Sequence, residues 1–113
     1  MSIRIQRVNE LLKEEVSQLL LKEMDFNNCL VTITEVETSA DLRQAKIKIS
    51  VLPPQKTDFI LKKIKRRIYP LQQQINHKLN MRPVPKLIFC VDKVSQKAQR
   101  VEDLLRQIKQ PKA

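Results

Sequence analysis

Hydrophobic residues recur at steps of three and four between positions 4 and 23 of the chain. The positions are Ile5, Val8, Leu12, Val16 and Leu19, with charged residues at many of the positions between them. This spacing matches the turn of a helix and predicts an amphipathic helix with one apolar face. The stretch that follows, "MDFNNC", favours turns because Asp and Asn side chains bond their own backbone. We therefore expect the first helix to end near residue 23.

Three later stretches alternate between apolar and polar residues, which is the period of a strand. Residues 31–36 alternate until the pattern slips by one at Val36, which indicates a bulge or a strand end. The second stretch places Ala45, Ile47, Ile49 and Val51 on one face and Lys46, Lys48 and Ser50 on the other. The third, "KLIFCVD", places Leu87, Phe89 and Val91 on one face. Between the first two strands, "ETSADLR" lacks glycine, so we expect a longer loop held by the side chains of Ser39 and Asp41.

A second helical pattern follows residue 57 and contains a proline. Its apolar stripe consists of Ile60, Leu61, Ile64, Ile68, Leu71 and Ile75. Pro70 lacks a backbone N–H and crowds the carbonyl of Arg66, so we expect a kink or a break there. Residues 95–113 carry four apolar residues at helical spacing, and we expect a basic tail that is helical or partly disordered.

The order of elements predicts one α+β domain. It is helix, strand, strand, helix with a break, strand and tail helix, in which one three-stranded sheet is covered by helices on one face. A chain of 113 residues with 42% hydrophobic residues is large enough for a single modest core. We divide it into a folded domain, residues 1–94, and the tail, residues 95–113.

The charge of the chain is uneven. Its net charge is +10, yet residues 1–40 hold four basic and seven acidic residues, whereas residues 41–113 hold eighteen and five. Such an excess repels itself unless a polyanion relieves it, which makes nucleic acid or an anionic membrane surface the leading class of partner.

Several kinds of chemistry find no support in the sequence. The chain has no glycine, which excludes the glycine-rich loops that bind nucleotide phosphates, and its one histidine, His77, falls on the expected solvent face of a helix. Cys29 and Cys90 lie far apart without metal-ligand spacing, so we interpret them as buried thiols of a reducing compartment. We expect a protein that binds without catalysing a reaction, without a cofactor or a metal.

The basic side chains are the candidate functional residues. By itself, a run such as that at residues 62–67 is often only a solvated helix face, but strand and tail residues add further charge, which favours one surface for phosphates. Scarce aromatic residues, 4% of the chain, argue against stacking on single-stranded bases. The candidate RNA-binding residues are Lys62, Lys63, Lys65, Arg66 and Arg67, followed by Lys46, Lys48, Arg82 and Lys86.

Four strings of residues, in order along the chain, resemble ribosome-binding factor A, an assembly factor for the small ribosomal subunit. They are "RIQRV" at 4–8, "VTITEVETSADLRQAKIKISVL" at 31–52, "LNMRPVPKLIFCVD" at 79–92 and "RVEDLLRQI" at 100–108. The resemblance implies a type II KH-like fold without the GXXG loop. It also implies binding to the 16S rRNA of the immature 30S subunit, near the decoding region and the 5′ end, and support of its final maturation, especially in the cold.

Two positions depart from that family pattern. Asn76 stands where a small Ala at the kink is common, and Gln72 stands where an Arg is usual. We therefore expect the break either near Pro70 or at Asn76. Arg4 and Arg7 match family positions, and we expect a structural or orienting role for them.

The sequence also bears on where the protein acts and on an alternative function. No signal peptide or membrane span is evident, so we expect a cytoplasmic monomer whose partners are the small subunit and its 16S rRNA, with no membrane. The alternative is a basic peripheral-membrane or protein-interaction module that uses the same charges.

Overall fold

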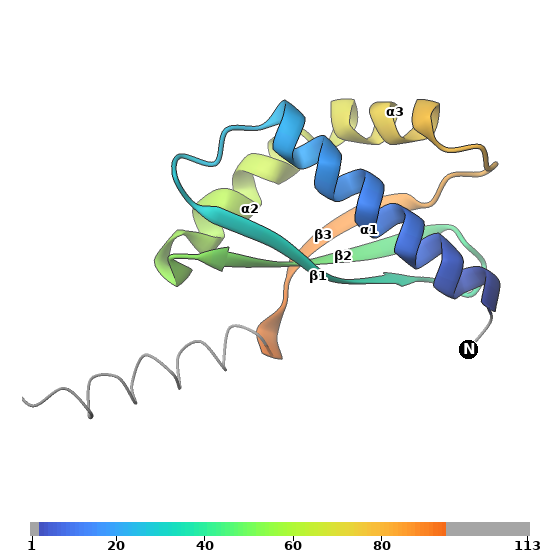
Figure 1. Cartoon of the computed structure of the whole chain (residues 1–113), viewed down its shortest axis with the longest axis horizontal. Coiled ribbons are helices and arrows are strands. Elements are labelled where there is room, and N and C mark those ends of the chain that lie inside the picture. The colour runs from blue at the N-terminus through green and yellow to red at the C-terminus, as the bar shows by residue number, and fades with distance from the viewer. Residues whose placement is uncertain (1–2, 95–113) are drawn as a thin grey trace, which may run out of the picture.

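A computed structural model describes residues 3–94 of the chain, and Figure 1 shows how its elements are arranged. The first helix, α1, spans Ile3–Glu23 and packs over strand β1. It buries Val8, Leu12, Val16 and Leu19 of the predicted stripe together with Leu20, whereas Ile5 of that stripe is only half-buried. The turn after α1 places Asn27 and Asn28 at positive φ, 53° and 66°, which Asn tolerates better than most residues.

Strands β1, Leu30–Thr38, and β2, Gln44–Leu52, form an antiparallel hairpin. The pairing shifts between Ile33 and Glu35, so the expected irregularity is a bulge within the strand. Ser39 and Asp41 hold the connecting loop, as predicted, because the Ser39 hydroxyl donates to Asp41 Oδ1 at 2.6 Å and Asp41 accepts from the Arg43 N–H at 3.1 Å. Leu42 completes the turn at a φ of 61°.

Strand β3, Lys86–Val91, lies beside β2 and runs parallel to it, giving the sheet order β1-β2-β3. A parallel neighbour requires a crossover, which here consists of a short 3-10 turn at Pro54–Lys56, helix α2 at Thr57–Arg66 and helix α3 at Ile68–Lys78. All three α-helices lie on the same face of the sheet (Figure 1). The prediction of an α+β domain with helices on one face is therefore confirmed for residues 3–94.

The break in the second helical stretch lies at Arg67. Its backbone leaves the helical region at φ −101° and ψ 12°, and helix α3 begins at the next residue. Pro70 thereby occupies the first turn of α3, where a backbone N–H has no partner in its own helix. Of the two expected places, the break is thus near Pro70, and α3 continues through Asn76 to Lys78.

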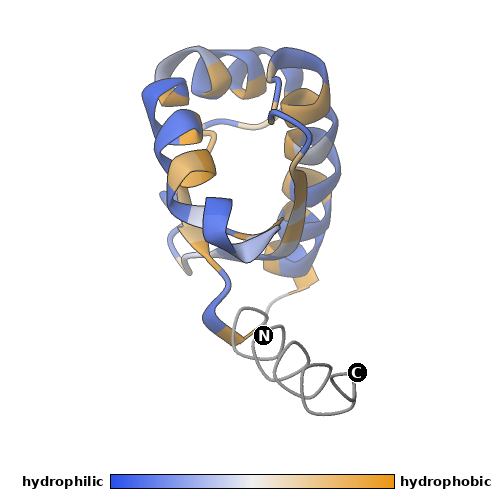
Figure 2. Ribbon diagram, turned by 90° about the vertical axis from the view of Figure 1, so that its left-hand side faces the viewer, coloured by the Kyte–Doolittle hydropathy of each residue, from blue (hydrophilic) through white to orange (hydrophobic). Residues whose placement is uncertain are grey.

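The core lies between the helices and the covered face of the sheet. Hydrophobic and hydrophilic positions alternate along each helix, as Figure 2 shows. The side chains with no exposed surface include Leu12, Ile47, Ile49, Ile60, Ile64 and Ile75, which come from α1, β2, α2 and α3. The opposite face of the sheet has no helix over it within residues 3–94 (Figure 1). The predicted tail, residues 95–113, lies outside the described residues, so the proposed division of the chain stays a prediction.

Candidate nucleic-acid interface

The outer face of α2 carries exposed basic side chains. Ile60 and Ile64 are fully buried against the sheet, so the helical period turns the residues opposite them toward solvent. Those exposed residues are Lys62, Lys65, Arg66 and, at the break, Arg67. The last turn of α2 is basic and its first turn holds Asp58, an arrangement that the helix dipole favours.

Lys63 differs from its neighbours in the same run. It is half-buried, and its ammonium group donates to the backbone carbonyl of Asp25 in the turn between α1 and β1. This contact joins α2 to the first connection of the chain. Lys63 therefore has a structural partner, whereas Lys62, Lys65 and Arg66 on the outer face of α2 form no ion pair or side-chain hydrogen bond with another group of residues 3–94.

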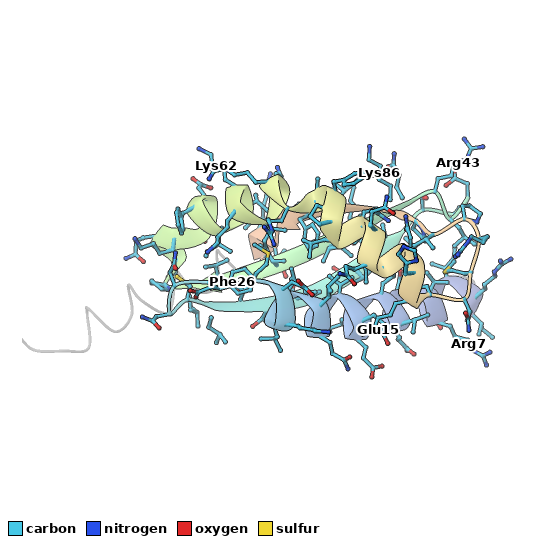
Figure 3. All side chains as sticks on the ribbon, turned by 90° about the horizontal axis from the view of Figure 1, so that it is seen from above. Arg7, Glu15, Phe26, Arg43, Lys62 and Lys86 are labelled. Atoms are coloured by element: carbon cyan, nitrogen blue, oxygen red, sulfur yellow. The ribbon has the colours of Figure 1, made fainter. Side chains whose placement is uncertain are left out.

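Lys86 and Arg43 extend the basic surface away from α2. The backbone N–H of Lys86, at the start of β3, donates to the Arg43 carbonyl at 2.9 Å, so the hairpin loop and β3 meet here. Figure 3 shows Lys62, Lys86 and Arg43 along one long side of the molecule, with Arg7 and Glu15 on the other. Sequence reasoning missed Arg43, because only the parallel pairing of β3 brings the loop next to Lys86.

We call this surface the basic side and define it as Lys62, Lys65, Arg66, Arg67, Lys86 and Arg43. Among the described residues, the only ion pair of this set joins Arg43 to Asp41 at 3.9 Å, and both of those side chains are largely exposed. An exposed pair at that distance contributes little to stability and can separate readily. The basic side thus presents cations that no carboxylate within residues 3–94 neutralises closely.

Lys46 and Lys48 lie on a different surface, the uncovered face of the sheet. Strand β1 places Glu37 opposite Lys46 and Glu35 opposite Lys48. Lys48 Nζ lies 2.9 Å from Glu37 Oε1 and 3.3 Å from Glu35 Oε2. Hydrogen bonds to these two carboxylates raise the pKa of Lys48, and the bond from Lys48 lowers the pKa of Glu37. The structure therefore does not bring Lys46 and Lys48 together with α2.

Arg82 lies at the end of α3, in the connection to β3. Its Nη1 donates to the carbonyl of Met81 at 2.8 Å and to those of Asn76 and Leu79 at 3.3 Å. A cation on the last carbonyls of a helix satisfies acceptors that have no partner in the helix and complements its dipole. This geometry gives Arg82 a role in ending α3.

Gln72 is a second residue whose role the sequence did not reveal. Its Nε2 donates to the Pro85 carbonyl at 3.1 Å, and its Oε1 accepts from the Leu87 N–H at 2.8 Å. It thereby holds the start of β3, including Lys86, against α3. The sequence distinguishes Gln72 only as a departure from the family pattern, which does not predict these hydrogen bonds.

The opposite side of the molecule is formed by α1, which carries most of the acidic residues of the first forty. Glu15 lies there, 3.0 Å from Lys78 at the end of α3. Charge therefore differs between the two sides: α1 holds four acidic and four basic residues, whereas α2 holds four basic residues and one acidic residue. Such a distribution orients a protein on a polyanion.

Two further observations concern the part of the chain that the structure describes. Within residues 3–94, no His, Cys, Asp and Glu side chains are grouped as ligands for a metal ion. No helix in that range has the length and apolar character needed to cross a bilayer.

Comparison with known sequences decides the family. The sequence profile described as "Ribosome-binding factor A" matches residues 4–105. The chain belongs to the ribosome-binding factor A family. A ribosome-binding factor A of Chlorobium phaeobacteroides is 35% identical to it, over 96% of this chain and 97% of the relative. One of Akkermansia muciniphila is 30% identical, over 96% and 86%. The family resemblance drawn from the four strings is confirmed.

Solved structures of ribosome-binding factor A share the fold. The crystal structure from Thermus thermophilus has a TM-score of 0.63 at 20% identity and covers 77% of this chain and 94% of its own. The solution structure of a putative member from Thermotoga maritima has a TM-score of 0.57 at 24% identity and covers 78% and 82%. A homology model of the Thermus protein, fitted into a cryo-EM map of a 30S complex, has a TM-score of 0.63 at 20% identity, covering 76% and 92%. The fold agrees with the KH-like architecture that the resemblance implied.

Proposed function

We propose that this chain binds the immature small ribosomal subunit by laying its basic side on the phosphates of 16S rRNA. The observation that carries the proposal is the basic side itself, where α2, β3 and the hairpin loop bring together cations without close carboxylate partners among residues 3–94. The Thermus relative fitted into a 30S complex supports the choice of the small subunit as partner. Bound in this way, the protein favours the final processing of the RNA without cleaving it.

Contact with the RNA backbone accounts for the chemistry of this surface better than base recognition does. Lysine and arginine neutralise phosphates and release counterions, which supplies affinity that is independent of sequence. Binding by stacking needs aromatic platforms, and the exposed rings of α2 and α3 are only Phe59 and Tyr69. Shape and charge therefore dominate, and the affinity depends strongly on salt.

The structure narrows the set of candidate residues within this proposal. Lys63 and Lys48 already contact groups of the protein, and Arg82 caps α3. We therefore assign the main phosphate contacts to Lys62, Lys65, Arg66, Arg67 and Lys86, together with Arg43. Lys63, Lys46, Lys48 and Arg82 contribute through the field of the protein or by holding the surface in place.

The double variant Lys62→Glu/Arg66→Glu tests the proposal. Both side chains are exposed, so the fold should be retained, and reversing two charges should weaken cosedimentation with precursor-containing subunits by at least about tenfold. The matched control is Lys13→Glu/Lys22→Glu, which reverses two exposed cations on α1. Equal loss of binding in both variants would mean that the net charge of the protein, and not the basic side, determines binding. Unchanged binding of Lys62→Glu/Arg66→Glu would contradict the proposal.

Two further measurements test the preference for immature subunits and the absence of RNA cleavage by the protein itself. The protein should bind precursor-containing subunits more tightly than mature ones across a salt titration. Purified precursor rRNA incubated with the protein alone should stay uncut. Flotation with anionic vesicles in place of cosedimentation would support the membrane alternative.

A further inference from the structure

A second surface lies at the start of α1, away from the basic side. It is a groove of about 450 Å³ between the first turns of α1 and the connection from α3 to β3. Its lining consists of Ile3, Arg4, Arg7, Val8, Leu11 and Met81. We call it the α1 groove. Figure 3 places Arg7 on the long side opposite Lys62, so the groove and the outer face of α2 lie on different sides of the molecule.

The two arginines of the α1 groove occupy an unfavourable place in their helix. The N-terminal end of a helix carries partial positive charge, which disfavours cations in its first turns. The first turn of α1 contains no acidic residue, and neither arginine forms an ion pair with a carboxylate of residues 3–94. Arg4 and Arg7 are one turn apart and both exposed. A carboxylate bound in the groove would form an ion pair with them and offset their repulsion by the helix dipole.

Apolar side chains flank these charges. Ile3 is 69% exposed and Leu11 is 39% exposed, while Met81 is half-buried beside them. Ile3, Arg7 and Leu11 are spaced by four residues and form one stripe of about 12 Å along the helix. The stripe therefore has a cationic side chain between two apolar ones, and Val8 lines the groove beside it.

We propose that the α1 groove binds a segment of a protein that presents a carboxylate between two apolar side chains. Aliphatic residues gain little against a phosphate backbone, and the groove contains no aromatic ring on which a base could stack, so protein fits better than RNA. A carboxylate can bind the arginines while the flanking side chains cover Ile3 and Leu11, which removes apolar surface from water. The inference rests on the proposed function only in locating the partner on the small subunit.

Photocrosslinking on the bound subunit tests the inference. A benzoylphenylalanine at Leu11 should crosslink to a protein of the subunit, at a peptide that contains Asp or Glu beside apolar residues. The same probe at Phe59, an exposed aromatic residue of α2 outside the assigned phosphate contacts, should crosslink to rRNA and shows that the chain is bound. A second probe at Ile3, which is more exposed, covers the case in which the Leu11 substitution disturbs the helix.

Charge reversal in the groove gives the matched comparison. Arg7→Glu should lower the protein crosslink from Leu11 about tenfold and leave the rRNA crosslink from Phe59 in place. Lys13→Glu, an exposed cation of the same helix outside the groove, should change neither. Crosslinks from Leu11 and Ile3 to rRNA alone overturn the inference, as does the absence of any crosslink from these two positions while Phe59 still crosslinks. If the unsubstituted chain does not bind the subunit at all, the proposed function is overturned instead.

Discussion

Removing the side-chain amide of Gln72 should destabilise the chain by weakening the attachment of β3. The Lys86 N–H donates toward the hairpin, to the Arg43 carbonyl, so the N–H of the next residue, Leu87, points to the outer edge of the sheet. No strand of residues 3–94 lies at that edge, and Gln72 Oε1 accepts this N–H at 2.8 Å. Gln72 Nε2 also satisfies the Pro85 carbonyl at 3.1 Å.

The expected loss follows from the groups left without partners. In Gln72→Leu, the N–H of Leu87, a residue that is 2% exposed, loses its acceptor. A buried donor without a partner costs about 1–3 kcal/mol, so we expect the free energy of unfolding to fall by about 2 kcal/mol. For a domain of this size that corresponds to a drop in melting temperature on the order of 10 °C.

Urea denaturation and amide exchange measure this effect. The matched control is Gln74→Leu, since Gln74 lies two residues away on α3 and its side chain is exposed. Exchange at the Leu87 amide should accelerate in Gln72→Leu and stay slow in the control. If both variants unfold within about 0.5 kcal/mol of each other, the hydrogen bonds of Gln72 do not hold β3 and the reasoning fails.

Four further outcomes are expected. Lys62→Ala should lower the slope of log affinity against log salt by somewhat less than one unit, and an unchanged slope would exclude a phosphate contact. The stability that the lowered pKa of Glu37 contributes is complete above its ordinary pKa of 4.5 and is lost as the pH falls through the lowered pKa. Lys48→Met should therefore make the free energy of unfolding depend less on pH in the acid range. The same pH dependence in the variant and the unsubstituted chain would refute this. Asn28→Ala should cost about 1 kcal/mol in urea denaturation and Asn28→Gly should not, because the φ is 66°; equal costs would point to another cause. Leu12→Ala should cost about 2–5 kcal/mol because Leu12 is fully buried in the core, and a smaller loss would mean that the site collapses around the cavity.

Local patterns in the sequence predicted most of the elements correctly. The alternation of residues 45–51 gives β2 its buried and exposed faces, and the slip near Val36 corresponds to the bulge between Ile33 and Glu35. These features depend on the side-chain periods of strands and helices, two and 3.6 residues, which can be recognised in a short stretch of sequence. The break was placed only approximately, since Pro70 shows that the helix cannot continue unchanged, whereas packing decides that Arg67 takes the bend.

The candidate site was less predictable than the fold. Lys62 and Lys63 are adjacent lysines in the same basic run, yet Lys62 is exposed and Lys63 contacts the Asp25 carbonyl. The sequence predicts Lys48 as an RNA-binding residue, but the antiparallel register brings Glu35 and Glu37 against it. Arg43 joins the basic side only because β3 pairs in parallel with β2.

The sequence by itself determined the helices and strands, the faces they bury, and the excess of positive charge after residue 40, because each is a property of neighbouring residues or of composition. Only the tertiary structure decided which cations stay unpaired and which side of the molecule they share. The reason is that a charge is neutralised by whatever lies within a few ångströms of it, and those partners come from elements far apart in the chain. For Lys48 and Lys63 the partners are 11 to 38 residues away.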